Sequence, residues 1–437
     1  MSSQLLGALV LFILFVYIMV SKIPNWVGYF IMAPLAILLG CCTSGDVTGV
    51  LNSSTLHLLV IIGMFSGLIG AAHLDVPMGD FIDKITGGED SHNKEIKTMI
   101  LLFIFASFFS WFLQNNYLTL SLLPVLFTIS KRQKVSHSKL ILFTIFATTL
   151  GGACTLIGTP TNIFASAALQ EVGLEPLKFF DFIFVGLPVM ILGGIYMIAA
   201  RKFFPSYEEE LPEEYRGEVE KRELTKEERK KLKACAIAFI SFVVSLALES
   251  LYGFFLPPFT WGYLMLVGMM LFGGFSPKEI IKCAKTDLIF QFSTSVLMVK
   301  IISNSGLSDL LGGFIANTLQ GQTNLYLITA ILFLGALLLT SFVNNKSTAM
   351  ILAPIAISIA NAMGANPQAM VLTIAVGAGC SFLTPFASAT NYMLVPYTNL
   401  KFTDFIKAGL PLAVINCICC VVILPIFVDL YLKLTQD

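Results

Sequence analysis

Charged residues are scarce in this sequence, and their scarcity excludes an ordinary soluble protein. Asp, Glu, Lys and Arg make up 12% of the 437 residues, whereas hydrophobic residues make up 56% and the mean hydropathy is +0.82. A typical globular chain is about 25% charged. Apolar runs of about 17 residues or more recur along the chain, and a helix of that length crosses the ~30 Å hydrocarbon core of a bilayer. The sequence therefore predicts an all-α polytopic membrane protein in a cell membrane.

Residues that bind metals or form disulfides are also few. The chain has four histidines, none in an HExxH motif, and several of its nine cysteines lie inside apolar runs. Neither residue type indicates a metal centre, a disulfide framework or a catalytic set within the membrane. We therefore expect a protein that is not an enzyme and that carries no cofactor.

One pattern occurs twice along the chain. Gln114-Asn115-Asn116 lies 230 residues before Asn344-Asn345-Lys346, and residues 181–188 share six of eight identities with residues 404–411. Each copy reads as three membrane spans, a re-entrant hairpin, a broken span and a final full span. Five crossings per copy is an odd number, so the second copy must be inserted upside down. We predict two inverted repeats, the arrangement that many transporters build around a central site.

The two copies divide the chain into three parts. The first inverted repeat covers residues 1–203, with its hairpin at about 98–130 and its broken span at about 138–170. The second covers residues 234–437, with its hairpin at about 325–361 and its broken span at about 368–397. Residues 204–233 form a charged linker that suits a short solvated helix, and residues 75–84 and 307–319 suit helices that lie along the membrane interface.

The distribution of basic residues predicts the orientation. If the first hairpin opens to the cytoplasm, the cytoplasmic loops hold 23 of the 27 lysines and arginines. This is the positive-inside pattern, and the opposite orientation fails it. The linker then lies in the cytoplasm and both termini lie outside.

Polar residues interrupt the apolar segments at four matching places, the two hairpin tips and the two broken spans. A helix that stops in mid-membrane leaves N–H groups that favour anions at one end and carbonyls that favour cations at the other. Thr159 and Pro160 form a natural N-cap and first-turn pair. These parts predict a site for a small anion with cation positions beside it, although the same Asn and Thr side chains could simply join helices. The expected substrate-binding residues are Asn115, Asn116, Thr161, Asn162, Asn344, Asn345, Lys346, Ser388, Thr390 and Asn391.

The strings FLQNNYLTLSLLP, GGACTLIGTPTN, SFVNNKSTAMILAPIAISIA and FLTPFASATN resemble the divalent anion/sodium symporter family, the dicarboxylate, citrate and sulfate permeases of the ion transporter superfamily. The resemblance implies a homodimer in which a transport domain slides past a scaffold domain, an elevator. It also implies Na+ as a coupling ion, held by Ser110, Asn115 and backbone carbonyls near Gly158. Thr340 stands in the corresponding place of the second half.

The sequence departs from that family at the hairpin tips and in the second break. The family carries Ser-Asn-Thr at each tip, whereas only the central Asn of each triplet is present here, and residues 388–391 lack the usual prolines. Lys346 replaces a small hydroxyl, and an ionisable residue within the membrane is a candidate functional group. We expect its ammonium to act as a built-in cation at the second site, so that fewer sodium ions are coupled than in a two-site relative. It could also pair with the substrate, or extend to water so that both sodium sites survive.

Secondary transport of a small di- or tricarboxylate, coupled to a cation or run as exchange, is the function that these patterns favour. Sulfate or another inorganic oxyanion is the alternative, because it needs the same amide and hydroxyl donors. A cation/proton antiporter would require an acidic residue in the hairpins or breaks, and none occurs there. A channel fits discontinuous inverted repeats less well than alternating access does. The expected partners are the substrate anion, the lipid bilayer and a second copy of the chain, with no nucleic acid.

Overall fold

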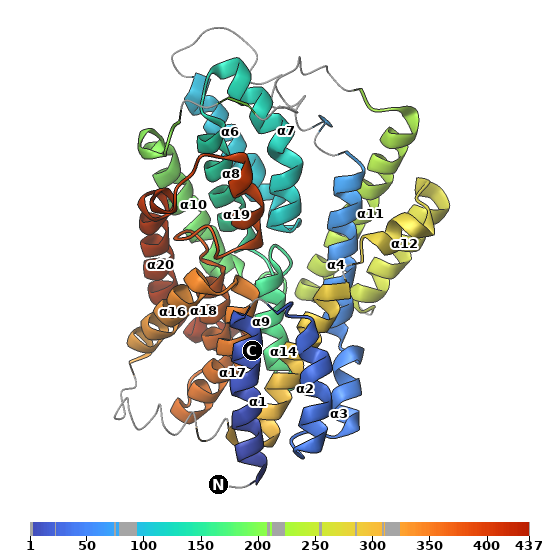
Figure 1. Ribbon diagram of the computed structural model, residues 1–437, viewed down its shortest axis with the longest axis vertical. Coiled ribbons are helices and arrows are strands. Elements are labelled where there is room, and N and C mark those ends of the chain that lie inside the picture. The colour runs from blue at the N-terminus through green and yellow to red at the C-terminus, as the bar shows by residue number, and fades with distance from the viewer. Residues whose placement is uncertain are drawn as a thin grey trace.

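The computed structural model describes residues 3–21, 23–73, 76–77, 94–207, 210–211, 223–252, 256–284, 286–307, 310 and 324–436. Every regular element within these residues is a helix (Figure 1). Seven of the described helices are long and apolar enough to cross a membrane. The prediction of an all-helical protein with several membrane spans is thus confirmed.

The helices of the first half follow the predicted segments closely. Three helices and one short helix precede the first hairpin: α1 (Ser3–Val20), α2 (Val27–Leu38), α3 (Ser44–Gly49) and α4 (Ser54–Ala71). The hairpin, the broken span and the final span are α6 (Lys94–Phe109) with α7 (Asn115–Gln133), α8 (His137–Gly152) with α9 (Pro160–Glu171), and α10 (Ile183–Ala199).

The second half repeats this order. Its first helices are α11 (Lys226–Tyr252), α12 (Pro258–Gly273), the short α13 (Pro277–Lys282) and α14 (Thr286–Asn304). The hairpin, the broken span and the final span are α16 (Leu325–Phe342) with α17 (Asn345–Met363), α18 (Pro367–Gly379) with α19 (Ala389–Leu394), and α20 (Phe402–Gln436). Three-residue 3-10 turns lie at Val50–Asn52, Arg201–Phe203 and Val395–Tyr397.

The amino-acid sequence explains where these helices begin and end. Gly364 ends α17 in a left-handed backbone conformation (φ +64°), which glycine adopts without steric cost. Two residues later the side chain of Asn366 accepts hydrogen bonds from the backbone N–H groups of Gln368 and Ala369, and Pro367 occupies the first turn of α18. The chain therefore turns from the hairpin into the broken span within three residues.

The helices form two groups. In what we call the frame group (α1–α4 and α11–α14), α4 packs on α11 and α12, and α14 packs on α1 and α2 in the same manner. In the core group (α6–α10 and α16–α20), α6 and α7 pack on α8, α16 and α17 pack on α18, and α10 packs on α20. Figure 1 shows α11 and α12 at one side of the molecule and α10 and α20 at the other.

The two hairpins enter the core group from opposite ends of the molecule. In Figure 1, α6 and α7 occupy the upper part of the core group, and α16 and α17 occupy the lower part. Each hairpin turns within a few residues, between Phe109 and Asn115 in the first and between Phe342 and Asn345 in the second. The tips of both hairpins therefore lie near the centre of the protein, away from both ends of the molecule.

The motif shared by residues 181–188 and 404–411 has a structural role in both halves. Asp181 accepts a hydrogen bond from the backbone N–H of Lys178 (2.7 Å), and Asp404 accepts one from that of Lys401 (2.8 Å). Its glycine allows close helix packing: a Cβ at Gly186 would overlap the Ala153 carbonyl, and one at Gly409 would overlap the Phe382 carbonyl. The motif therefore holds each final span against the break in front of it.

The linker ends earlier than residue 233. Thr225 and Glu228 form a reciprocal cap, in which each backbone N–H donates to the other side chain, and this cap starts α11 at Lys226. The basic residues after it belong to α11, and Lys231 binds Glu279 of α13 over 2.8 Å. Most of the interfacial helices predicted at 75–84 and 307–319, and most of the linker before residue 223, lie outside the described residues.

Candidate functional site

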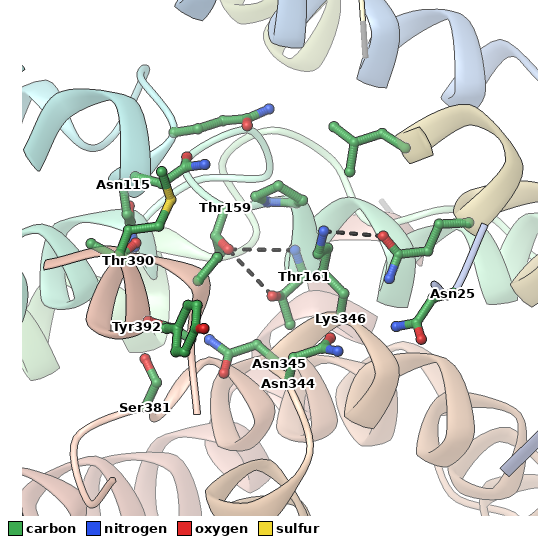
Figure 2. Close-up of a pocket in the computed structure, with 18 of the residues that line it drawn as sticks. Asn25, Asn115, Thr159, Thr161, Asn344, Asn345, Lys346, Ser381, Thr390 and Tyr392 are labelled. Carbon is green, nitrogen blue, oxygen red and sulfur yellow. Dashed lines mark hydrogen bonds between the residues drawn. The ribbon is translucent and has the colours of Figure 1, made fainter. Parts of the chain in front are cut away.

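A cavity of about 540 Å³ lies between the two hairpin tips, the two breaks and one face of α14 (Figure 2). Eight of the ten residues expected to bind substrate contribute to its wall. They are Asn115, Asn116, Thr161, Asn344, Asn345, Lys346, Ser388 and Thr390. Residues 230 positions apart in the chain thus meet in one site.

Helix starts surround much of this cavity. Asn115 and Asn345 are the first residues of α7 and α17, and Pro160 is the first residue of α9. The Thr159 hydroxyl accepts a hydrogen bond from the backbone N–H of Thr161 over 3.4 Å (Figure 2). Because unpaired N–H groups at helix starts carry partial positive charge, this end of the cavity favours an anion.

Lys346 directs its ammonium into the cavity. Its Nζ donates a hydrogen bond of 3.1 Å to Oε1 of Gln291, which lies on α14 with 6% of its surface exposed (Figure 2). One residue further along α17, the Ser347 hydroxyl accepts a hydrogen bond of 3.1 Å from the side-chain amide of Asn25. The second hairpin tip is therefore bound to the frame group by two side-chain contacts.

A set of oxygen atoms lies behind the first hairpin tip. Ser110, which is fully buried, donates to the Thr148 carbonyl over 2.7 Å, and its hydroxyl lies 2.5 Å from the Asn115 amide. With its nitrogen turned inward, that amide donates to the carbonyls of Thr148 and Gly158, at 3.2 Å each; turned the other way, its oxygen faces them. Only with the amide oxygen turned inward do oxygen atoms alone face this position, and oxygen ligands are those that suit a hard cation such as Na+.

The second hairpin tip contains the same set. The buried hydroxyl of Thr340 donates to the Ala378 carbonyl over 2.8 Å and lies 2.9 Å from the side-chain amide of Asn345. With its nitrogen turned inward, the Asn345 amide reaches the carbonyls of Ala378 (3.2 Å) and Ala387 (2.5 Å). Each of these four residues lies 229 or 230 positions after its counterpart in the first half. Both halves therefore contain a candidate cation position behind the cavity wall.

Asn162 and Asn391, the other two residues expected to bind substrate, are not among the residues that line this cavity. At most 2% of each side chain's surface is exposed. The Asn162 amide donates to the carbonyls of Gly152 (3.2 Å) and Thr155 (2.8 Å), and the Asn391 amide donates to two carbonyls in the second break, both at 2.9 Å. These amides satisfy carbonyls that the broken helices leave unpaired.

The sequence analysis missed the contribution of the frame group to the cavity. Asn25 and Trp26 come from the turn between α1 and α2, and Asp287 and Gln291 come from α14. Asp287 and Gln291 are four residues apart and therefore share one face of the helix. Two polar residues with that spacing in an otherwise apolar segment are the sequence feature that could have indicated a polar helix face. Asp287 also gives the cavity an acidic group, although none occurs in the hairpins or breaks.

Lys300, the lysine of α14, also has a partner. Its Nζ lies 3.0 Å from the Glu171 carboxylate at the end of α9. Next to it, Gln170 accepts a hydrogen bond of 2.5 Å from the Thr55 hydroxyl of α4. The end of α9 is thus bound to two frame-group helices.

Comparison with known proteins identifies the family. The model of a family described as citrate transporters matches residues 15–377 and 257–435 of this chain. The chain belongs to the citrate transporter family. It is therefore a membrane transporter rather than an enzyme, and the resemblance to the anion permeases of the ion transporter superfamily is confirmed.

Relatives from other organisms agree with this family. An uncharacterised transporter of Haemophilus influenzae is 25% identical over 74% of this chain and 71% of its own length. A sodium-dependent dicarboxylate transporter, SdcS, of Staphylococcus saprophyticus is 21% identical over 71% of this chain and 65% of its own length. The crystal structure of the YdaH transporter of Alcanivorax borkumensis has a similar fold, with a TM-score of 0.60, 12% identity, and coverage of 88% of this chain and 87% of that one.

Proposed function

We propose that this protein is a secondary active transporter of a small di- or tricarboxylate and that the cavity between the hairpin tips is its substrate site. The observation that carries the proposal is the position of Lys346, a cation beside three helix starts in a cavity rich in amides and hydroxyls. An organic anion loses its hydration shell on entering such a site, and charge-assisted hydrogen bonds compensate for that loss. The name of the family and that of the staphylococcal relative support a carboxylate.

The cavity volume favours an organic anion over sulfate. About 540 Å³ lies within the range of sites for small organic molecules, roughly 300–1,000 Å³, and greatly exceeds the space that a tetrahedral oxyanion fills. A small inorganic ion would leave many polar side chains of the wall without a partner. The cavity volume therefore favours a di- or tricarboxylate as the substrate.

The coupling ion in this proposal is Na+, bound at both oxygen sets. The Ser110–Asn115 set and the Thr340–Asn345 set are equally complete, and the Lys346 ammonium lies at Gln291 in the cavity. This arrangement favours pairing of Lys346 with the substrate over the alternative that it replaces a second sodium ion. A cation behind each tip would also fix the Asn amide with its oxygen inward.

Alternating access in this proposal is a movement of the core group against the frame group. The matching order of helices and the opposite entry of the hairpins support two inverted repeats with ten crossings. The distribution of basic residues supports a cytoplasmic linker and both termini outside. Sliding would break the side-chain bonds between the groups: Lys346 to Gln291, Asn25 to Ser347, Lys300 to Glu171 and Thr55 to Gln170. The family resemblance adds a homodimer held by the frame groups.

Uptake into proteoliposomes tests this function. Purified protein is reconstituted, and uptake of labelled di- and tricarboxylates, a monocarboxylate and sulfate is measured with and without an inward sodium gradient. We expect uptake of a di- or tricarboxylate that the gradient stimulates. Uptake of sulfate alone would contradict the carboxylate assignment. Carboxylate uptake at the same rate with and without the sodium gradient would contradict sodium coupling.

A further inference from the structure

The two hairpin tips use their first polar residue differently. Asn344 is the N-cap of α17, and its side chain accepts a hydrogen bond of 2.9 Å from the backbone N–H of Ser347. Gln114 occupies the matching N-cap position of α7, and its longer side chain makes no capping hydrogen bond. The amide of Asn344 therefore serves the helix, whereas that of Gln114 does not.

Nε2 of Gln114 is a buried donor without a hydrogen-bond partner among the residues that the structure describes. The side chain is 2% exposed, and its Nε2 has no hydrogen-bond partner although it is shielded from solvent. The same residue forms part of the cavity wall. Buried polar groups in proteins are almost always paired, and one that is not calls for an explanation such as a missing ligand.

We propose that Gln114 Nε2 donates to a second carboxylate of the substrate, while Lys346 at the other tip binds the first. The proposal rests on the function argued above and extends it to a substrate class: organic anions with two carboxylates separated by a carbon chain. The tips belong to different hairpins, and both line the same cavity. Gln114 is then the residue that distinguishes dianions from monoanions, because a monocarboxylate leaves its amide unpaired and an unpaired buried donor weakens binding.

Substitution of Gln114 by Met tests this role, because Met has a similar length and no donor. The dissociation constants of a dicarboxylate and of the monocarboxylate with the same carbon chain are measured on purified wild type and on Gln114→Met, together with thermal stability without ligand. We expect the dissociation constant of the dicarboxylate to rise about tenfold or more in Gln114→Met, because the variant loses one hydrogen bond to a charged group. For the monocarboxylate we expect little change. The unliganded variant should be at least as stable as wild type, since the substitution removes an unpaired buried polar group.

Two further variants keep the test decisive. Gln114→Glu retains the size and adds a negative charge, so it should weaken dicarboxylate binding more than Gln114→Met does. Asn366→Ala is the control: it removes the cap of α18 outside the cavity wall, so it should lower thermal stability and leave the preference for the dicarboxylate intact.

Either of two results would overturn the inference. The first is an unchanged dicarboxylate dissociation constant in Gln114→Met, and the second is an equal loss for both ligands. A wild type that binds no carboxylate at all would instead contradict the proposed function on which the inference rests.

Discussion

Lys346 and Gln291 meet inside the cavity, where Nζ of the lysine donates to the side-chain carbonyl of the glutamine over 3.1 Å. The bond joins a hairpin tip in the core group to α14 in the frame group. An isolated ammonium within a membrane protein is costly, and a neutral amide satisfies only part of its hydrogen-bonding capacity. A substrate carboxylate is a stronger partner because it brings the opposite charge. The contact with Gln291 thus keeps the ammonium in the cavity wall, within reach of an anion.

Substitution of Lys346 by Met should weaken substrate binding and leave sodium coupling in place. Loss of one hydrogen bond to a charged group costs roughly 1.5–3 kcal/mol, which predicts a rise in KM of about tenfold or more. The Hill coefficient for sodium should equal that of wild type, because Lys346 lies in the cavity and not in the Thr340–Asn345 set. The measurement is initial uptake against sodium concentration. A variant that gains sodium dependence would show instead that the lysine replaces a sodium ion.

Removal of the Ser110 or the Thr340 hydroxyl, one in each proposed sodium position, should weaken sodium binding. Ser110→Ala and Thr340→Ala remove matching oxygens from the two halves, and neither residue lines the cavity. We expect the sodium concentration for half-maximal uptake to rise several-fold in each variant, with substrate KM near wild type at saturating sodium. The two variants are controls for each other. An effect in one half only would mean that the other set holds no ion.

Substitution of Asn162 or Asn391 by Ala should lower stability more than substrate affinity. Each change leaves two buried carbonyls without a donor, and each unsatisfied group costs about 1–3 kcal/mol. Thermal unfolding of the purified variants should therefore begin at lower temperature, while the folded fraction keeps a substrate dissociation constant near wild type. Asn115→Ala is the comparison, since it should impair binding directly. Variants that keep wild-type stability but have lost substrate binding would contradict this prediction and show that Asn162 and Asn391 bind substrate.

Labelling of introduced cysteines tests the orientation of the chain. Asn52, before α4, and Glu223, before α11, are both exposed, and the charge pattern puts the first outside and the second in the cytoplasm. A membrane-impermeant maleimide applied to intact cells should modify Asn52→Cys and spare Glu223→Cys. Modification of Glu223→Cys alone would mean that the protein is inserted the other way up.

The sequence predicted well where the helices around residues 109–115, 152–160, 342–345 and 379–389 end and begin, because local chemistry controls helix ends. Membrane spans demand long apolar runs, and polar interruptions at Asn115 and Asn345 mark the tips at which the hairpin helices begin. The repeated motif at 181–188 and 404–411 was recognised as a repeat, and the structure adds its physical reason, close packing of Gly186 and Gly409 on carbonyls of the breaks.

The roles of individual polar residues were harder to predict, because they depend on tertiary contacts. Asn162 and Asn345 look alike in the sequence, and the amides of both contact backbone carbonyls, yet only Asn345 lies in the cavity wall. The contribution of Gln291 could not be derived either, since it requires α14 to lie beside a hairpin 55 residues further along the chain. Pairing of Lys300 with Glu171 depends on long-range packing in the same way.

Counterflow tests the central claim, carrier-type transport of a carboxylate through this cavity, most directly. Proteoliposomes are loaded with unlabelled di- or tricarboxylate and diluted into a trace of the same labelled anion, for wild type and for Lys346→Met. We predict transient accumulation of label above equilibrium with wild type, because a carrier exchanges one bound anion for another, and much slower accumulation with the variant. Equilibration of label without overshoot would contradict alternating access, and equal counterflow by both proteins would contradict the assignment of this cavity as the substrate site.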